Sequence, residues 1–332
     1  MKLLFLAIIF ASFLCTYLIL PSWIKKSHLN GLVGKDMHKK DKRKVAEGGG
    51  IAVLAGVSLG ILLYVALNTF YFYNNEKLIY IFALLSVLFI ASIVGIVDDL
   101  LGWKKGLSRK IRIIIILFAA VPLMVINAGT STMSLPFFGA INFGILYPLL
   151  IIPLGVLATT VTFNTLAGYN GLEASQGILI LSALSLVTYL TGNAWLSLII
   201  LFMVASLIAF YIFNKYPAKI FPGDILTYST GALIASIAIL GDIEKIAIFF
   251  FIPYIIEAVL KTRGKWEKES FAKLSKDGSL EMPYKKIYGL EHLAIYILKK
   301  IKTSKKVYEK EVVYLINGFQ VLIIIIGFLI FM

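Results

Sequence analysis

Ten apolar runs, each close to the length needed to cross a lipid bilayer, constrain this chain more than any other feature of its sequence. A transmembrane helix needs about 20 predominantly apolar residues. The runs lie near residues 3–20, 49–69, 78–97, 113–128, 141–160, 174–190, 194–213, 225–241, 244–260 and 311–332. Hydrophobic residues make up 59% of the chain, against roughly 45–50% in soluble domains. We therefore predict an all-α polytopic membrane protein with about ten transmembrane helices, in a single domain that spans residues 1–332.

Lysine and arginine residues indicate which side of the membrane each loop faces. With the N-terminus outside, 29 of the 32 Lys and Arg residues fall in five inward loops, at residues 21–48, 98–112, 161–173, 214–224 and 261–310. Cytoplasmic loops carry an excess of these residues, so we predict both termini outside and these loops in the cytoplasm. The same bias explains the net charge of +14, and we expect no nucleic-acid partner.

The loop at residues 261–310 is the long polar stretch of the chain. Within it, Tyr288–Ile301 (YGLEHLAIYILKKI) places apolar residues at helical spacing beside lysines. This pattern is typical of an amphipathic helix that lies in the lipid headgroup layer. The sequence therefore predicts an interfacial helix in this cytoplasmic loop.

Two adjacent carboxylates end the third apolar run. Asp98 and Asp99 stand at its inner end, where anions oppose both the helix dipole and each other. This placement costs stability unless cations compensate, and five basic residues follow: Lys104, Lys105, Arg109, Lys110 and Arg112. Two interpretations stay open, an ordinary charged loop and an acid pair that takes part in chemistry.

Amide and carboxylate side chains also stand at the inner ends of two other runs. TFNTLAGYNGLEA (162–174) contains Asn164 and Asn170 but no Lys or Arg, and FPGDILTYSTG (221–231) contains Asp224. Amide and carboxylate oxygens suit Mg²⁺, which takes few protein ligands and keeps phosphate oxygens and water. The alternatives are a glycine turn in the first segment and a helix cap at Asp224.

A glycine-rich segment leads into the second run. GKDMHKKDKRKVAEGGGIAVLAG (34–56) carries Glu47 before three glycines and lacks the Walker P-loop spacing, so it does not support a soluble nucleotide-binding fold. It is either a glycine-rich helix entry or part of a binding site. His28, His38 and His292 never stand at metal-ligand spacing, and we expect them to be solvated or interfacial.

Together these segments resemble the polyprenyl-phosphate N-acetylhexosamine-1-phosphate transferases. The resemblance rests on GKDMHKK with AEGGG, DD followed by KGLSRKIR, NTLAGYNGLEA, FPGD and SLEMPY, in family order over residues 34–284. It favours the archaeal and eukaryotic branch, which starts N-glycan assembly on dolichyl phosphate. The resemblance implies a ten-helix fold, a cytoplasmic active site and a lateral groove for a polyprenyl or dolichyl phosphate. The implied reaction moves GlcNAc 1-phosphate from UDP-GlcNAc to that lipid and releases UMP.

The resemblance also implies roles for individual residues. Asp98 and Asp99 would form the catalytic acid pair with Lys110 beside them, while Mg²⁺, or Mn²⁺ in its place, would bind Asn164 and Asp224. The remaining residues would hold the nucleotide sugar: Phe221 stacked on uracil, Asn170 and the backbone near Met37 at the uracil edge, Gly168 and Glu47 by the ribose, and Arg263 and Lys265 at phosphate.

Two departures from the family pattern concern the sugar. Val161 replaces the first Asn of the common NxxN pattern, and Gly264 stands in the histidine place of TRGKW. The last loop also lacks the histidine-rich signature of the bacterial peptidoglycan branch, which disfavours a MurNAc-pentapeptide donor. Another UDP-N-acetylhexosamine stays open as the donor, and so does assembly as a homodimer.

A proline and an acid in the ninth run bear on lipid access. Pro253 stands in the middle of FIPYIIEAVL, where it should bend the helix and open a side groove. Glu257 in the same run is costly in lipid, so it should face protein or the groove.

A secondary transporter of an anionic sugar or nucleotide is the alternative from another class. Transporters place polar groups near the bilayer midplane on broken helices, often with internal repeats. Here the polar residues stand at the ends of runs on one side, and no repeat is visible. The pattern therefore favours an enzyme that acts at the cytoplasmic face.

Overall fold

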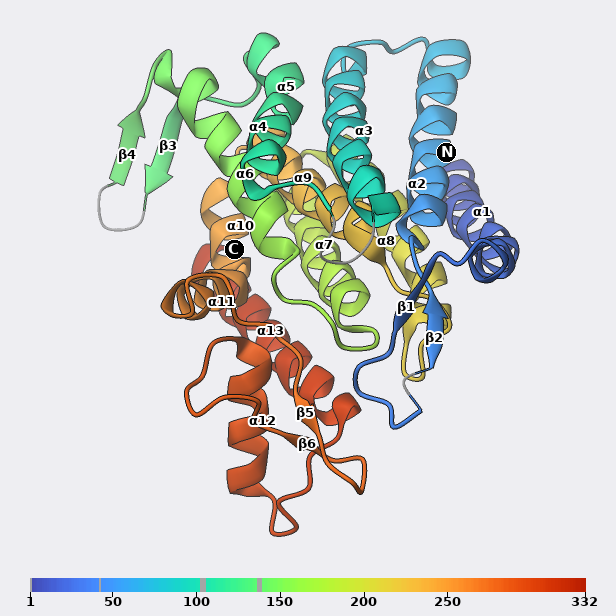
Figure 1. Cartoon of the computed structure of the whole chain (residues 1–332). Helices are drawn as coiled ribbons and strands as arrows, with labels where there is room; N and C mark the ends of the chain where they lie inside the picture. The colour runs from blue at the N-terminus through green and yellow to red at the C-terminus, as the bar shows by residue number, and fades with distance from the viewer. Residues whose placement is uncertain (1, 42, 102–105, 136–138) are drawn as a thin grey trace.

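The computed structural model describes residues 2–41, 43–101, 106–135 and 139–332. These residues are mostly helical, as predicted (Figure 1). The long helices are α1 (Lys2–Leu29), α2 (Gly50–Leu67), α3 (Leu78–Leu101), α7 (Leu172–Leu190), α8 (Ala194–Asn214), α9 (Gly223–Leu240) and α13 (Glu309–Phe331). The shorter helices are η1 (Asn68–Phe72), α4 (Arg109–Ala119), α5 (Val121–Val125), η2 (Tyr147–Ile151), α6 (Ile152–Phe163), α10 (Glu244–Phe250), α11 (Ile252–Arg263) and α12 (Leu290–Ile301). The strands form three hairpins: β1 (Val33–Lys35) with β2 (Lys44–Ala46), β3 (Thr132–Leu135) with β4 (Gly139–Asn142), and β5 (Lys273–Leu274) with β6 (Leu280–Glu281).

Seven helices in the described part of the chain are long and apolar enough to cross a membrane, with α2 and η1 together forming one of them. The other three predicted runs also contain helix. Two of them are divided, into α4 and α5 and into α10 and α11, with Pro122 and Pro253 at the second position of the later piece, where the missing N–H interrupts the helical ladder. In the third, η2 continues directly into α6, and Tyr147–Phe163 is one apolar helix that is shorter than the seven others. A bend at Pro253 was predicted, and the helix is interrupted there. Ten complete spans and outward termini stay predictions.

Helix α9 lies at the centre of the bundle, packed against α2, α3 and α6, with nearly all of its residues buried. Two glycines allow its neighbours to approach this closely. A Cβ atom at Gly95 of α3 would stand 2.3 Å from the backbone nitrogen of Ile225, and one at Gly50 of α2 would stand 2.4 Å from that of Leu226. Gly50, the last glycine of AEGGG, therefore serves helix packing, in line with the interpretation of that segment as a helix entry.

Gly95→Ala is expected to lower the free energy of unfolding by about 1–3 kcal/mol, because the added methyl meets backbone atoms of α9, which cannot move aside like a flexible side chain. Gly155→Ala in α6 is the matched control, since nothing lies within 4 Å of a Cβ atom there. Thermal unfolding in detergent compares the two variants. Equal melting temperatures would contradict this account of the α3–α9 contact.

Backbone hydrogen bonds join segments that are about 170 residues apart in the sequence. Ala46, at the end of the β1–β2 hairpin, forms a parallel bridge with Ile220. The N–H of Phe221 donates to Ala46 O at 2.7 Å, and the N–H of Gly49 donates to Phe221 O at 3.0 Å. The segment that contains Glu47 is thereby fixed against FPGD at the start of α9.

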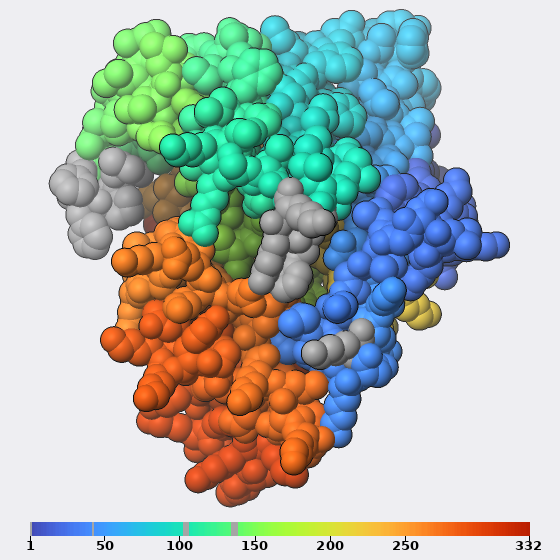
Figure 2. Space-filling view, viewed as in Figure 1, coloured from blue at the N-terminus to red at the C-terminus, as the bar shows by residue number. Residues whose placement is uncertain are grey.

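Helix α12 confirms the predicted helix within residues 288–301. Its residues Leu290, Ala294 and Ile295 are buried, and it packs against α11 and α13. Figure 1 shows it projecting beyond the bundle together with β5 and β6, and Figure 2 shows this orange to red part of the chain meeting the blue N-terminal segment below α3 and α4. Contacts within the protein therefore account for its amphipathic pattern, and a position in the headgroup layer stays a prediction.

Glu257 of α11 faces protein, as predicted for an acid in an apolar run. Its side chain is fully buried. The carboxylate accepts a hydrogen bond from the N–H of Leu290 at 2.5 Å, and Lys261 Nζ lies 3.4 Å from its other oxygen. Glu257 thus ties the start of α12 to α11. The lateral groove for an isoprenoid chain stays a prediction.

Candidate active site

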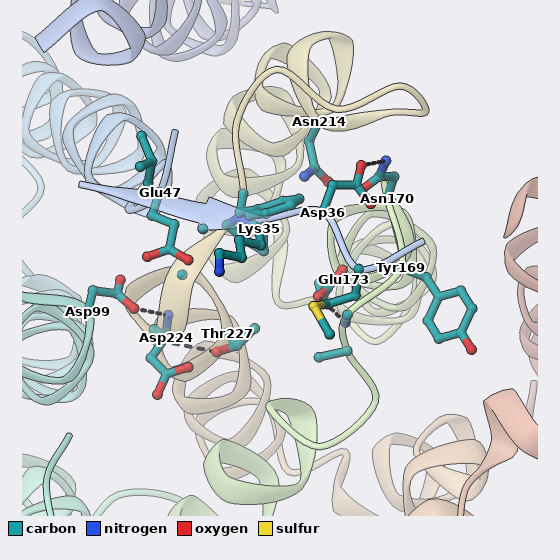
Figure 3. Close-up of a pocket in the computed structure, with 18 of the residues that line it drawn as sticks. Lys35, Asp36, Glu47, Asp99, Tyr169, Asn170, Glu173, Asn214, Asp224 and Thr227 are labelled. Atoms are coloured by element: carbon teal, nitrogen blue, oxygen red, sulfur yellow. Dashed lines mark hydrogen bonds between the residues drawn. The ribbon is translucent and has the colours of Figure 1, made fainter. Parts of the chain in front are cut away.

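Helix ends converge around a pocket of about 490 Å³, within the range of roughly 300–1,000 Å³ that small-molecule sites occupy. The C-terminal ends of α1, α3, α6 and α8 meet the N-terminal ends of α2, α7 and α9 there, beside the β1–β2 hairpin (Figure 3). Eight of the twelve predicted site residues line the pocket: Met37, Glu47, Asp99, Asn164, Gly168, Asn170, Phe221 and Asp224. The tertiary structure therefore brings together residues that are up to 187 positions apart in the sequence.

Asp99 caps the start of α9. Its Oδ1 accepts a hydrogen bond from the N–H of Asp224 at 2.7 Å, and its Oδ2 lies 3.4 Å from the N–H of Ile225 (Figure 3). Gly223, with φ +70°, brings the backbone so close that a Cβ atom there would stand 2.1 Å from Asp99 Oδ2. Capping was considered for Asp224 itself, and this was wrong. The cap comes from α3, and the Asp224 side chain faces the pocket.

Asp98 faces a different side of α3 from Asp99, because neighbouring residues on an α-helix are about 100° apart. Its Oδ1 accepts from the N–H of Leu107 at 2.7 Å, and its Oδ2 lies 2.8 Å from Arg112 Nη2. Arg112 Nη1 lies 3.9 Å from Asp224 Oδ2. Arg112 therefore links the two carboxylates from behind the pocket, and this cation compensates the charge at the end of α3.

Lys110 is exposed in the first turn of α4. Residues two apart on a helix point in nearly opposite directions, about 200° apart, so Lys110 cannot face Asp98 from the same side as Arg112. The observed partner of Asp98 is thus Arg112, although Lys110 was predicted beside the acid pair. Its catalytic role stays a prediction, while Lys104 and Lys105 lie outside the described residues.

Arg263 and Lys265 are exposed and are not among the residues that line the pocket. Arg263 ends α11, and Lys265 follows with φ 56°. Arg109 Nη2 donates to Trp266 O at 2.8 Å, which ties this segment to the start of α4. The contact of the two cations with phosphate stays a prediction.

Thr227 links the two predicted metal ligands. Its hydroxyl lies 2.9 Å from Asn164 Oδ1. It also lies 3.1 Å from the backbone oxygen of Asp224 (Figure 3). Asn164 caps the end of α6 and Asp224 lies in the first turn of α9, so the packing of these helices places both at the pocket. The described residues contain no group of three His, Cys, Asp or Glu that could enclose a metal. A pair of hard oxygen donors nonetheless fits Mg²⁺, which fills its remaining positions with phosphate oxygens and water.

Glu47 forms the pocket wall opposite Asn170. The backbone of Gly34 packs on its carboxylate so closely that a Cβ atom there would stand 2.1 Å from Glu47 Oε1. Burial raises the pKa of the Glu47 carboxyl above its ordinary value. The wall is therefore held by the β1–β2 hairpin.

A buried polar network holds the other wall. Glu309, in the first turn of α13, accepts a hydrogen bond from the backbone N–H of Asn170 at 2.7 Å and forms an ion pair with Lys39. The Asn170 amide donates to Asp36 Oδ2 at 3.1 Å (Figure 3), and Asp36 Oδ1 accepts from the N–H of His38 at 3.2 Å. The network joins the turn after β1 to the loop before α7 and fixes the orientation of Asn170.

Two of the three histidines are buried, so the expectation that all were solvated or interfacial was wrong for them. His28 is exposed. His38 accepts from the N–H of Ala272 at 3.1 Å, and its Nδ1 lies 3.7 Å from Glu309 Oε1. His292 is fully buried, and burial together with the charge of Lys261 lowers its pKa to about 4. Both histidines therefore help to hold together segments that are far apart in the sequence.

Several residues at the site were missed by reasoning from sequence. Asp36 and Lys35 stand inside the quoted segment GKDMHKK, so proximity to Met37 was a usable signal. Arg112 was one of five candidate cations, and helical spacing from Asp98 did not separate it from the others. Glu309 gave no signal at all, because it stands 139 residues after Asn170 at the start of an apolar run.

Comparison with known proteins supports the family that the sequence motifs indicated. The family described as "Glycosyl transferase family 4" matches residues 80–242. A protein of Saccharolobus solfataricus, provisionally named UDP-N-acetylglucosamine–dolichyl-phosphate N-acetylglucosaminephosphotransferase, is 35% identical over 96% of this chain and 94% of its own length. The Dictyostelium discoideum protein of the same name is 30% identical over 74% of this chain and 69% of its own length.

A bacterial relative extends the comparison. The phospho-N-acetylmuramoyl-pentapeptide-transferase of Streptococcus pyogenes is 28% identical over 74% of this chain and 75% of its own length. The Saccharolobus and Dictyostelium proteins are more similar to this chain than the Streptococcus protein is. This agrees with the archaeal and eukaryotic branch that the sequence motifs favour. The chain therefore belongs to glycosyl transferase family 4, within the polyprenyl-phosphate N-acetylhexosamine-1-phosphate transferases.

Proposed function

We propose that this protein transfers GlcNAc 1-phosphate from UDP-GlcNAc to dolichyl phosphate, forming a lipid diphosphate sugar and releasing UMP. The observation that carries the proposal is the convergence of the family-matched residues on one pocket at the ends of the helices. The names of the archaeal and Dictyostelium relatives support the donor and the acceptor. The Lys and Arg distribution supports a cytoplasmic position for this pocket.

Charge is the main barrier to this reaction, because a dianionic lipid phosphate must approach a diphosphate. The pocket offers Asn164 and Asp224 as the ligands of Mg²⁺, which would supply charge neutralisation at the diphosphate. Arg112 holds Asp224 from behind, and Thr227 fixes Asn164. Phe221 and Asn170 line the same pocket and would orient the uracil ring.

The acid pair would position other groups rather than remove a proton. A phosphate monoester has a second pKa near 6, so the lipid phosphate is mostly dianionic at pH 7 and needs no base. Asp98 holds Arg112, and Asp99 caps α9. Asp98 thus acts on Asp224 through Arg112, and Asp99 binds the backbone of Asp224 directly. Both acids at the end of α3 therefore help to fix the position of Asp224.

Asp99→Asn is therefore expected to lower activity by a similar factor at pH 6 and at pH 8, because asparagine keeps only one of the two oxygens that accept from the amides of α9, and this loss does not depend on pH. UMP release at both pH values, relative to the unmodified protein at the same pH, measures this. Activity that is lost at pH 6 but recovers at pH 8 would instead favour proton removal by Asp99.

Transport of an anionic sugar or nucleotide lacks a specific observation in its favour. The helix interruptions near Pro122 and Pro253 stand among apolar residues, whereas a transporter would place polar groups at such breaks. The pocket instead lies at the helix ends. This arrangement supports chemistry at one membrane face.

The direct test is UMP release by the purified protein in detergent, with Mg²⁺ and dolichyl phosphate. UDP-GlcNAc, UDP-GalNAc and UDP-MurNAc-pentapeptide are compared as donors. We expect release from UDP-GlcNAc that requires both the lipid phosphate and Mg²⁺. Binding of UDP-GlcNAc without UMP release would favour transport, and faster release from another donor would change the assigned sugar.

A further inference from the structure

The pocket is strongly acidic, although the proposed donor is an anion. Five carboxylates line it, from Asp36, Glu47, Asp99, Glu173 and Asp224. Lys35 is the one cationic side chain among the described residues that line it. Two of these carboxylates already accept hydrogen bonds within the protein, since Asp99 caps α9 and Asp36 bonds to Asn170. A diphosphate nonetheless needs cationic contacts to enter such a pocket.

Lys35 is placed to make such a contact. It is the last residue of β1, and its side chain is exposed. Figure 3 shows its amine directed into the middle of the pocket, between Glu47 and Asp99 on one side and Glu173 on the other. Among the described residues, no carboxylate lies within 4.0 Å of Lys35 Nζ. The amine is therefore surrounded by acids without forming an ion pair with any of them.

Two other cations near the pocket, among the residues that the structure describes, already have partners. Lys39 forms a buried ion pair with Glu309 and lies over the ring of Tyr216. Arg112 is bound to Asp98. A lysine that is free to move on a four-carbon stem suits a phosphate, because its ammonium group acts as a point charge with three donors.

We propose that Lys35 binds the diphosphate of the nucleotide sugar, between the predicted metal ligands and the wall that contains Asn170. This inference rests on the proposed function for the identity of the ligand. It adds a phosphate contact from the β1–β2 hairpin to the contacts predicted for Arg263 and Lys265. The hairpin is fixed to FPGD through the Ala46–Ile220 bridge, so binding at Lys35 also places the donor relative to Asp224.

Binding measurements on Lys35→Met and Lys35→Gln test this, with UDP-GlcNAc, UMP and uridine as probes in the full-length protein with Mg²⁺. Loss of one charge-assisted hydrogen bond should weaken UDP-GlcNAc binding about tenfold or more. Uridine carries no phosphate, so its affinity should not change. Lys35→Arg should retain most of the affinity for UDP-GlcNAc.

Lys40→Met is the matched control. Lys40 belongs to the same segment and is exposed, but it lies next to Gly278 and does not line the pocket. An unchanged affinity of the Lys35 variants for UDP-GlcNAc would overturn the proposal. So would an equal loss of affinity for uridine and UDP-GlcNAc, because Lys35 would then only support the shape of the pocket.

The same measurements separate this inference from the proposed function. If the unmodified protein binds UDP-GlcNAc through Lys35 but never releases UMP, the phosphate contact stands and the transfer reaction does not. If the protein releases UMP and the Lys35 variants bind and turn over the donor normally, the reaction stands and the phosphate contact does not. Absence of any binding of uridine nucleotides to the unmodified protein would contradict both.

Discussion

Replacement of Asp224 by alanine is expected to lower sugar-phosphate transfer by about 100-fold or more and to remove its response to Mg²⁺. Asp224 supplies the charged oxygen of the proposed metal site, and Asn164 supplies a neutral one. The α9 cap is provided by Asp99, so the side chain of Asp224 can be removed without loss of the cap. UMP release is measured against Mg²⁺ concentration for Asp224→Ala and Asn164→Ala.

Asp41→Ala serves as the control for this loss of charge. Asp41 lies in the loop between β1 and β2, is mostly exposed and stands 3.9 Å from Arg43, and it does not line the pocket. Its removal should leave transfer and metal response unchanged. An unaltered metal response in both Asp224→Ala and Asn164→Ala would show that these residues are not the metal ligands.

Glu309→Ala is expected to lower the free energy of unfolding by about 3 kcal/mol, because it removes the nearer carboxylate of the buried Lys39 and leaves only that of Asp36, at 3.6 Å. The change also removes the acceptor for the backbone N–H of Asn170. Lys39 lies in the loop of the β1–β2 hairpin, and Glu309 begins α13, 270 residues later. The replacement therefore removes the ion pair that joins α13 to this hairpin. Unfolding in detergent, followed by heat or denaturant, measures the effect.

Glu281→Ala is the comparison for an exposed pair. Glu281 of β6 bonds to Lys299, and its side chain is nearly half exposed. A solvent-exposed ion pair contributes about 0–1 kcal/mol, so this variant should unfold close to the unmodified protein. If Glu309→Ala were no less stable than Glu281→Ala, the buried network would not hold the pocket wall.

The helical pattern was predictable because hydrophobicity acts along the chain. Every predicted apolar run contains helix, and the run ends place Asp99, Asn164 and Asp224 correctly at helix ends. The divided helix at Pro122 was not predicted, although proline was used as a signal at Pro253. A proline near the start of a helical piece is compatible with a helix that begins there, so its presence in an apolar run does not by itself show where the helix is interrupted.

Pairings between charged groups were less predictable. Sequence offered five cations for Asp98, and Arg112 was selected because α4 turns it toward α3 while Lys110 faces the opposite side. Sequence also suggested that Asp224 caps its own helix, whereas the close approach of α3 at Gly95 allows Asp99 to do so. Such choices depend on crossing geometry between helices, which local sequence does not encode.

By itself the sequence determined the membrane class, the family and most of the residues that meet at the pocket, because hydrophobic length and family motifs are properties of contiguous segments. Only the tertiary structure decided which partner each charged group takes: Glu309 pairs with Lys39 and Asn170, Asp99 caps α9, and Lys35 has no carboxylate partner among the described residues. The physical reason is that the energy of a charge depends on distance and burial, and both are set by the packing of segments that lie far apart in the chain.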